Sequence, residues 1–215
     1  MLKELDEKVF DTYTKESCYW AGFLAADGCI DVNNTIRIEL AGKDKEHVTL
    51  FKEFCKSDHN ISHNELKDSY KVGFSSKYMK EALFFNFSLT VDKTHNLVYP
   101  LLQETWQYAA YLRGFFDGDG CFSQFFNNRP KASFRVFLTN GSLHFLEELL
   151  EHLRIISIIK GGSIQKKASN CWHIQLGIQD STNFLNWIYS IDGPKLSRKY
   201  LMYEDIIVNG NRITR

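Results

Sequence analysis

A twelve-residue phrase occurs twice in the chain, 92 positions apart, as Tyr19–Ile30 and Tyr111–Phe122. Tyr, Gly, Phe, Asp, Gly and Cys recur at matching positions. Each copy is an apolar run at helical spacing that stops at an acidic residue followed by glycine, at Asp27-Gly28 and Asp119-Gly120. A duplication that keeps a carboxylate in the same place twice predicts two half-sites that face each other across a pseudo-twofold axis.

The same order of elements follows each copy of the phrase. In the first half, Cys29–Asn33 and Ile36–Leu40 alternate polar and apolar residues, which predicts an antiparallel hairpin with a turn at Asn33-Asn34. Ile36, Ile38 and Leu40 would face the core. A helix from about Asp44, a second hairpin and a helix capped by Ser75-Ser76 complete this half.

The second half repeats the pattern, with a longer turn in its first hairpin, a turn at Gly161-Gly162 in its second and a last helix capped by Ser181-Thr182. Each half therefore reads αββαββα, and residues 91–103 join the two. We expect an α+β fold of two pseudo-symmetric halves with saddle-shaped antiparallel sheets and helices on one face of each. Residues 1–16 would flank a first half at 17–100 and a second at 101–215.

Both repeated helices carry small residues four positions apart, which would let their backbones approach closely. These residues are Gly22, Ala26, Gly114 and Gly118. Close packing would bring Asp27 and Asp119 together at the helix C-termini, where negative charge is unfavourable. A divalent cation with oxygen ligands, such as Mg²⁺, would relieve this repulsion. A single Asp-Gly pair would be explained by a left-handed glycine cap, whereas two pairs in register favour a paired site.

Composition narrows the class of protein. The chain has 215 residues with 31 aromatic side chains and only three prolines, which predicts an ordered core. No apolar run approaches the length of a membrane span, and the polar, acidic start is unlike a signal peptide. Five cysteines without a Cys-x-x-Cys pair indicate a reducing compartment and disfavour a zinc site. We expect a soluble intracellular protein, in the cytoplasm of a bacterium or phage host or in an organelle.

Charge alone argues against a nucleic-acid partner, because 26 basic and 26 acidic residues balance. The distribution is uneven, however: residues 1–105 hold 13 basic and 17 acidic side chains, and residues 106–215 hold 13 and 9. Phosphate binding depends on where cations cluster rather than on their sum.

The repeated phrases, WAGFLAADG at residues 20–28 and LRGFFDGDG at 112–120, resemble the LAGLIDADG motif. From about Ser17 to Tyr203 the chain is similar to single-chain, two-motif LAGLIDADG homing endonucleases. The resemblance implies that the motif helices form the interface and that Asp27 and Asp119, with the preceding Ala26 and Gly118, hold two or three Mg²⁺ ions. The sixth motif position is Ala25 in one copy and Asp117 in the other. This difference makes the halves unequal but removes no implied metal ligand.

The resemblance also implies that the sheets lie along the major groove of double-stranded DNA, where base edges carry a distinguishable hydrogen-bonding code. The expected DNA-binding residues on the open faces are Asp31, Asn33, Arg37, Glu39 and Lys71 in the first half and Ser123, Asn127, Arg129, Arg135, Gln165, Lys167, His173 and Gln175 in the second. Acidic side chains among them would accept from cytosine amino groups.

The implied activity is a magnesium-dependent endonuclease that acts as a monomer in intron homing and makes a staggered double-strand break. Lys43 and Asn140, after the second strand of each half, are candidate groups that order the attacking water and stabilise charge. Lys93 and Lys199, after the last helix of each half, are further candidates. His47 and His144 occupy similar positions in the two halves, where we expect them on helix surfaces.

Two other functions remain open from the sequence. A maturase that binds intron RNA, or a degenerate DNA-binding regulator, would keep the fold without cleavage, but the retention of both Asp27 and Asp119 favours the enzyme. A helix-paired α+β module that binds a protein partner would require a contiguous exposed apolar patch. The sequence does not indicate such a patch.

Overall fold

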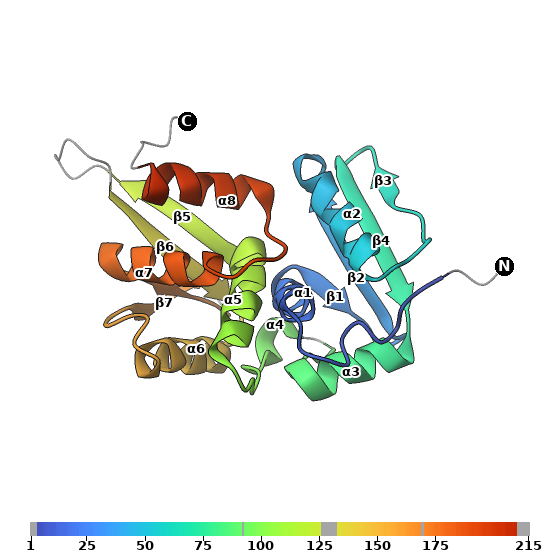
Figure 1. Ribbon diagram of the computed structural model, residues 1–215, viewed down its shortest axis with the longest axis horizontal. Coiled ribbons are helices and arrows are strands. Elements are labelled where there is room, and N and C mark those ends of the chain that lie inside the picture. Colours follow the sequence, from blue (N-terminus) through green and yellow to red (C-terminus); the bar gives the residue numbers. More distant parts are fainter. Residues whose placement is uncertain (1–3, 92, 126–132, 169, 210–215) are drawn as a thin grey trace.

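The computed structural model describes residues 4–91, 93–125, 133–168 and 170–209. Two halves lie side by side, and helices α1 (Lys15–Ala26) and α5 (Thr105–Asp119) pack against each other between them (Figure 1). These two helices contain the repeated phrases, so the duplication in the sequence forms the centre of the molecule.

The two halves have the same order of strands and helices. The first half continues with β1 (Gly28–Ile30), β2 (Thr35–Ala41), the short 3-10 helix η1 (Gly42–Asp44), α2 (Lys45–Phe54), β3 (Ser62–Asn64), β4 (Ser69–Ser75), α3 (Lys77–Phe87) and α4 (Lys93–Asn96). The second half continues with β5 (Gly120–Phe125), β6 (Ser133–Asn140), α6 (Leu143–Ile155), β7 (Ser163–Ala168), β8 (Cys171–Gln175), α7 (Ile178–Tyr189), α8 (Ser197–Tyr203) and the π-helical turn η2 (Glu204–Val208).

Both sheets are four-stranded and antiparallel, with the orders β1-β2-β4-β3 and β5-β6-β8-β7. One face of each sheet is buried. Ile36, Ile38 and Leu40 point into the core from β2, as the alternation predicts, and Val136 and Leu138 do so from β6. The predicted α+β class and the repeated αββαββα order are confirmed, with η1, α4, α8 and η2 as additions.

Two local predictions are wrong. Asn33 and Asn34 lie in the β1–β2 turn as predicted, but the turn also includes Asp31, because Asp31 Oδ1 accepts from the backbone N–H groups of Asn33 and Thr35, both at 2.9 Å. Helix α7 begins at Ile178, ahead of the expected cap at Ser181. The Ser181 hydroxyl is instead buried and accepts from the Val136 N–H at 2.9 Å.

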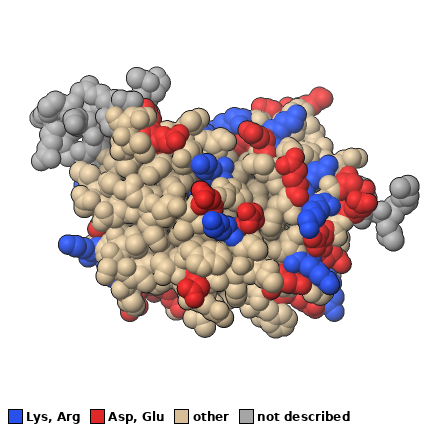
Figure 2. Space-filling view, in the orientation of Figure 1, with Lys and Arg blue, Asp and Glu red and all other residues tan. Residues whose placement is uncertain are grey.

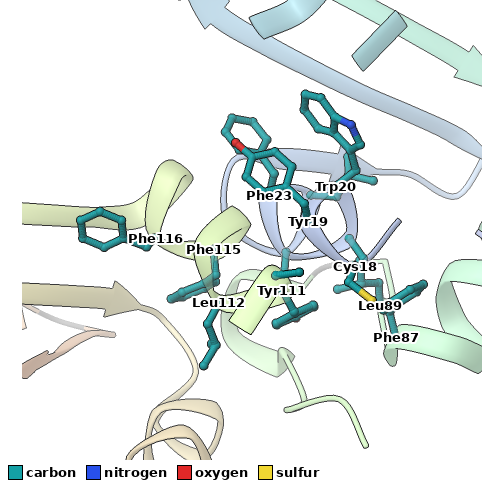
Figure 3. Packing of buried hydrophobic residues seen from close by; sticks show 14 of the residues in the cluster. Cys18, Tyr19, Trp20, Phe23, Phe87, Leu89, Tyr111, Leu112, Phe115 and Phe116 are labelled. Atoms are coloured by element: carbon teal, nitrogen blue, oxygen red, sulfur yellow. The ribbon is translucent and has the colours of Figure 1, made fainter. Parts of the chain in front are cut away.

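Glycines allow α1 and α5 to touch through their backbones. A Cβ atom added at Gly22 would lie 1.8 Å from the Tyr111 carbonyl oxygen, and one added at Gly114 would lie 1.9 Å from the Tyr19 carbonyl oxygen. Buried aromatic side chains of both helices, among them Phe23 and Phe115, surround this contact (Figure 3). The predicted close packing along the small-residue stripes is therefore confirmed.

The glycines after the two motif aspartates do not act as left-handed caps. In the described residues, positive φ angles among glycines occur only at Gly162 and Gly193. A Cβ at Gly28 would instead lie 2.6 Å from the Leu24 Cα, and one at Gly120 would lie 2.5 Å from the Phe116 carbonyl oxygen. These glycines let each helix turn directly into the first strand of its half.

Lys and Arg side chains are interspersed with Asp and Glu on the face shown in Figure 2, mostly over the first half. On this face, basic and acidic side chains therefore lie next to each other, in keeping with the balanced net charge of the sequence. Within the described parts of the chain, no helix is long and apolar enough to cross a membrane.

The backbone contact between α1 and α5 predicts the effect of Gly114→Ala. Alanine normally stabilises a helix relative to glycine by about 1 kcal/mol. Here the added methyl group would force the helices apart, so we expect the free energy of unfolding to fall by about 3 kcal/mol or more. Chemical denaturation of both proteins measures this difference.

Gly177→Ala is the matched control, because nothing lies within 4 Å of a Cβ added at this position. We expect it to cost less than about 1 kcal/mol, the ordinary cost of replacing a glycine N-cap. Equal losses in the two variants would contradict the backbone-contact explanation.

Candidate active site

The two motif aspartates lie at the adjoining C-terminal ends of α1 and α5. Asp27 is the C-cap residue of α1, and Asp119 is the last residue of α5. A Cβ added at Gly118 would lie 3.2 Å from the Asp27 backbone nitrogen and 3.5 Å from the Asp27 Cβ. Asp27 is thus packed against the residue that precedes Asp119, so the repeat brings the two carboxylates to one place.

The Asp27 and Asp119 carboxylates carry like charges, and this affects the pKa of Asp119. Asp27 is exposed, whereas Asp119 is half-buried. Burial, reinforced by the neighbouring Asp27 charge, raises the pKa of the Asp119 carboxyl to about 6. The charges of Lys93 and Lys199 act in the opposite direction on this pKa. The site therefore combines two carboxylates with two ammonium groups.

Each lysine caps the C-terminus of the motif helix in its own half. Lys93 Nζ donates to the carbonyl oxygens of Ala25 and Ala26, at 2.8 and 2.7 Å. Lys199 Nζ donates to the carbonyl oxygens of Phe116 and Gly120, both at 2.6 Å, and to that of Gly118 at 3.2 Å. A cation is favourable at these helix ends because unpaired carbonyl groups carry partial negative charge there.

Burial affects both ammonium groups. It lowers the pKa of Lys93, and it lowers the pKa of Lys199 to about 8. The carboxylates of Asp27 and Asp119 oppose both shifts. Sequence position alone nominated these lysines, and the structure places both beside the carboxylates.

Lys43 and Asn140 occupy different surroundings. Lys43 is exposed in η1. Asn140 is buried at the end of β6, where its Oδ1 accepts from the Ser142 N–H at 2.9 Å at the start of α6. Asn140 therefore has a local structural contact, and the catalytic roles of both residues stay predictions.

The donor set at the helix ends suits a hard cation. Mg²⁺ is commonly held by one or two carboxylates, with water and substrate phosphate oxygens filling its other positions. Asp27 and Asp119 supply two such carboxylates, while the Ala26 and Gly118 carbonyls already accept from lysines. No cluster of three or more His, Cys, Asp or Glu side chains with metal-binding geometry occurs among the described residues. A cation here would therefore depend on both aspartates.

The first sheet places its predicted DNA-binding strand residues on one open face. Arg37, Glu39 and Lys71 are all exposed, and Glu39 lies directly across from Lys71 in the β2–β4 pair. A groove of about 540 Å³ is lined by Glu39, Lys71 and Ser69 together with residues of β3 and the β3–β4 turn. Ser69 Oγ donates to Glu39 Oε1 at 2.7 Å, which holds this carboxylate on the open face.

The second sheet presents a comparable face of polar side chains. Ser123 pairs across strands with Arg135, and Gln165 pairs with His173. Gln175 lies on this face, and Lys167 is exposed at an irregularity in β7. The remaining two predicted DNA-binding residues, Asn127 and Arg129, fall outside the described residues.

Residues 106–191 match the family model for the LAGLIDADG-like domain. The match lies within the second half of the chain. No curated protein sequence matches it. The fold is similar to that of the I-LtrWI LAGLIDADG homing endonuclease bound to target DNA, at 15% identity and a TM-score of 0.58, covering 94% of this chain and 92% of that one.

The same fold occurs in the I-SmaMI LAGLIDADG homing endonuclease bound to cleaved DNA, at 14% identity and a TM-score of 0.63, covering 87% of this chain and 86% of that one. It occurs again in I-SmaMI bound to uncleaved DNA in the presence of calcium ions, at 14% identity and a TM-score of 0.63, covering 89% and 90%. The resemblance in the two motifs therefore extends to the arrangement of both halves.

The sixth position of the second LAGLIDADG motif has a structural role. Asp117 is fully buried, and its Oδ2 accepts from the Tyr19 hydroxyl and the Leu196 N–H, both at 2.7 Å. Its Oδ1 accepts from the Tyr189 hydroxyl at 3.2 Å. Burial raises the pKa of Asp117 to about 6. Ala25 at the matching position has no such groups, so the two motifs are unequal, as expected.

His47 extends this network into α2, and the prediction of a surface position is wrong. Its ring is buried against Trp20 and Phe23, and its Nε2 lies 2.8 Å from the Tyr19 hydroxyl oxygen. Burial lowers the pKa of His47 to about 3. A single histidine in an amphipathic helix does not reveal a partner 28 residues earlier. His144 is exposed, as predicted.

The buried His47 predicts a pH-dependent difference in stability. Unfolded His47 takes up a proton below about pH 6.5, whereas the folded side chain stays neutral down to about pH 3. The unfolded state therefore binds more protons between these values, and stability falls as the pH is lowered. We expect His47→Gln to remove a slope of about 1.4 kcal/mol per pH unit over most of this window.

Chemical denaturation from pH 7.5 to 4 measures this slope. His144→Gln is the control, because it removes a histidine from the corresponding helix of the other half without touching Tyr19. Indistinguishable pH slopes for the two variants would show that His47 is protonated in the folded protein.

Proposed function

We propose that the chain is a DNA endonuclease that makes a staggered double-strand break in a long duplex target. One observation carries the proposal: two carboxylates, Asp27 and Asp119, lie at adjoining helix ends, and each of these ends is capped by a lysine. Two equivalent half-sites at one axis suit the two strands of a duplex. A single copy of the chain supplies both, so we expect a monomeric enzyme that acts in homing.

The open faces of the sheets support DNA as the substrate. Each face carries polar and charged side chains in cross-strand pairs, and these are the kinds of group that contact base edges. The similar structures of I-LtrWI and I-SmaMI hold DNA. The balanced net charge is compatible with this role because base recognition uses acceptors such as Glu39 as well as cations.

The proposed chemistry assigns distinct tasks to the residues of the site. Asp27 and Asp119 would hold Mg²⁺. A bound divalent cation lowers the pKa of a coordinated water and stabilises the leaving oxygen of a phosphodiester. Lys93 and Lys199 neutralise part of the negative charge of the carboxylates and helix ends, so a phosphate can approach. Lys199 Nζ, whose pKa burial lowers to about 8, donates to three carbonyl oxygens and is thereby held at the end of α5.

The charge-neutral variants Asp27→Asn and Asp119→Asn test the proposal. Each should reduce cleavage by at least about 100-fold, because the remaining carboxylate cannot hold the cations for both strands. DNA binding should persist, since Asp27 and Asp119 belong to the ends of α1 and α5 and not to the sheet strands. The measurement is a Mg²⁺-dependent cleavage selection on DNA that contains the intron-free form of the host gene, with binding followed by gel shift.

Asp58→Asn, at an exposed position, is the matched control for these variants. Cleavage that survives both motif substitutions would contradict the assignment. Specific binding without cleavage by the wild-type chain would instead indicate the alternative, a maturase or a regulator on the same fold.

Arg37 provides a separate test of the DNA interface. It is exposed on β2 opposite Gly73. Arg37→Ala should weaken specific binding by about 1–3 kcal/mol and relax specificity at a base pair of the target. Fluorescence anisotropy on matched and singly changed duplexes measures both effects.

Lys77→Ala removes an exposed cation from helix α3 and is the control for Arg37→Ala. We expect it to leave the sequence preference unchanged. An equal loss of binding in both variants on every duplex would mean that Arg37 contributes only general electrostatic attraction.

A further inference from the structure

Helix α8 connects the two halves through consecutive side chains. Arg198 reaches the first half, where its Nε donates to both carboxylate oxygens of Asp44, at 3.0 and 2.9 Å. Lys199 reaches in the other direction and caps α5 in the second half. In Figure 1 the N-terminal end of α8 faces α2, the helix that begins directly after Asp44. The first turn of α8 thus spans the interface beside the carboxylate site.

The Arg198–Asp44 ion pair is partly buried and differs in this from an ordinary surface ion pair. The Asp44 side chain is only 7% exposed, while that of Arg198 is 42% exposed. A carboxylate this buried is stable as an ion only with a close charged partner. The pair therefore fixes where the first turn of α8 lies relative to the first half.

A second contact fixes the start of α8 to the second half. The Leu196 N–H, at the N-cap of α8, donates to the buried Asp117 carboxylate at 2.7 Å. Asp117 also accepts from Tyr19 of α1. Lys199 directly follows these two anchors, which are at residues 196 and 198, and is itself only 4% exposed. Its ammonium position therefore depends on both halves at once.

Lys93 is held differently. It belongs to the short helix α4, caps α1 of its own half and is followed by the segment that joins the halves. In the first half, Ala25 occupies the place of Asp117 and has no carboxylate to anchor a following helix. The two lysines thus make equivalent hydrogen bonds at the helix ends, but only the helix that carries Lys199 is anchored by a buried carboxylate.

We propose that Arg198 and Asp44 are positioning residues. Their ion pair, called the strap below, fixes α8 across the interface and holds Lys199 in place for the cut made on its side of the site. The predicted effect on DNA cleavage rests on the proposed endonuclease function, whereas the predicted effect on the position of Lys199 does not. We predict that loss of the strap slows the cut of one DNA strand, the strand that depends on Lys199, more than the other.

The experiment compares Arg198→Met, Asp44→Asn and the double variant on a duplex labelled separately on each strand. Lys199→Met serves as the reference that identifies the affected strand. We expect each strap variant to slow that same strand roughly tenfold, since misplacement of a catalytic group by a fraction of an ångström has effects of this order. Nicked DNA should accumulate, and the double variant should be no slower than the single variants.

The two single variants separate the strap from direct DNA contact by Arg198. Asp44→Asn keeps the Arg198 charge, so a role of Arg198 on phosphate alone would leave Asp44→Asn with the wild-type rate. Arg198→Lys retains a cation for Asp44 and should restore most of the rate. Lys56→Met and Asp6→Asn are the matched controls, because they break an ion pair of 2.8 Å that lies away from α8. Both should cut like the wild type.

A measurement without DNA tests the strap independently of cleavage. Brief amine acylation followed by mass spectrometry should label Lys199 slowly in the wild type and faster in Arg198→Met and Asp44→Asn, with the exposed Lys77 as internal reference. Unchanged labelling of Lys199, or equal slowing of both strands, would overturn the proposal. If the wild type cuts no DNA, the proposed function fails, and the labelling alone decides whether the strap exists.

Discussion

The backbone contact between α1 and α5 is the constraint on which the rest of the structure depends. With Gly22 and Gly114 at the crossing, the helices approach closely enough for their C-termini to end side by side. This places Asp27 and Asp119 together at two ends that already carry partial negative charge, an arrangement that costs roughly 0.3–1 kcal/mol for each carboxylate. The capping by Lys93 and Lys199 offsets this cost, and the same four groups form the candidate site.

A buried polar chain joins the halves beside that contact. His47, Tyr19 and Asp117 connect α2, α1 and α5, and the Leu196 N–H continues the chain to α8. Buried polar groups are costly unless each finds a partner, so a chain of this kind stabilises one arrangement of the four elements over others. The apolar packing of α1 against α5 holds the halves together, and the polar chain adds a directional constraint on α8.

The sequence predicts those features that repeat or are local. The two phrases gave the central helices and the paired carboxylates, and alternation gave the buried Ile36 and Ile38. The predictions at Asp31 and Ser181 were wrong. Asp31 follows a strand pattern but accepts hydrogen bonds within a turn, and Ser181 resembles a helix cap but its hydroxyl accepts from the Val136 N–H. Only the folded chain makes these hydrogen bonds. Arg198 and Asp44 are 154 residues apart, and no local pattern links them.

The open faces of the two sheets also bear on the symmetry of the proposed DNA target. A palindromic site would require equivalent side chains at matching strand positions. The first sheet instead presents the Glu39 carboxylate beside Arg37 and Lys71, while the second presents Arg135, Lys167 and His173 with neutral side chains. A guanidinium group and a carboxylate select different base edges. The backbone duplication thus supplies two similar surfaces, and the divergence of their side chains favours a target whose two half-sites differ in sequence.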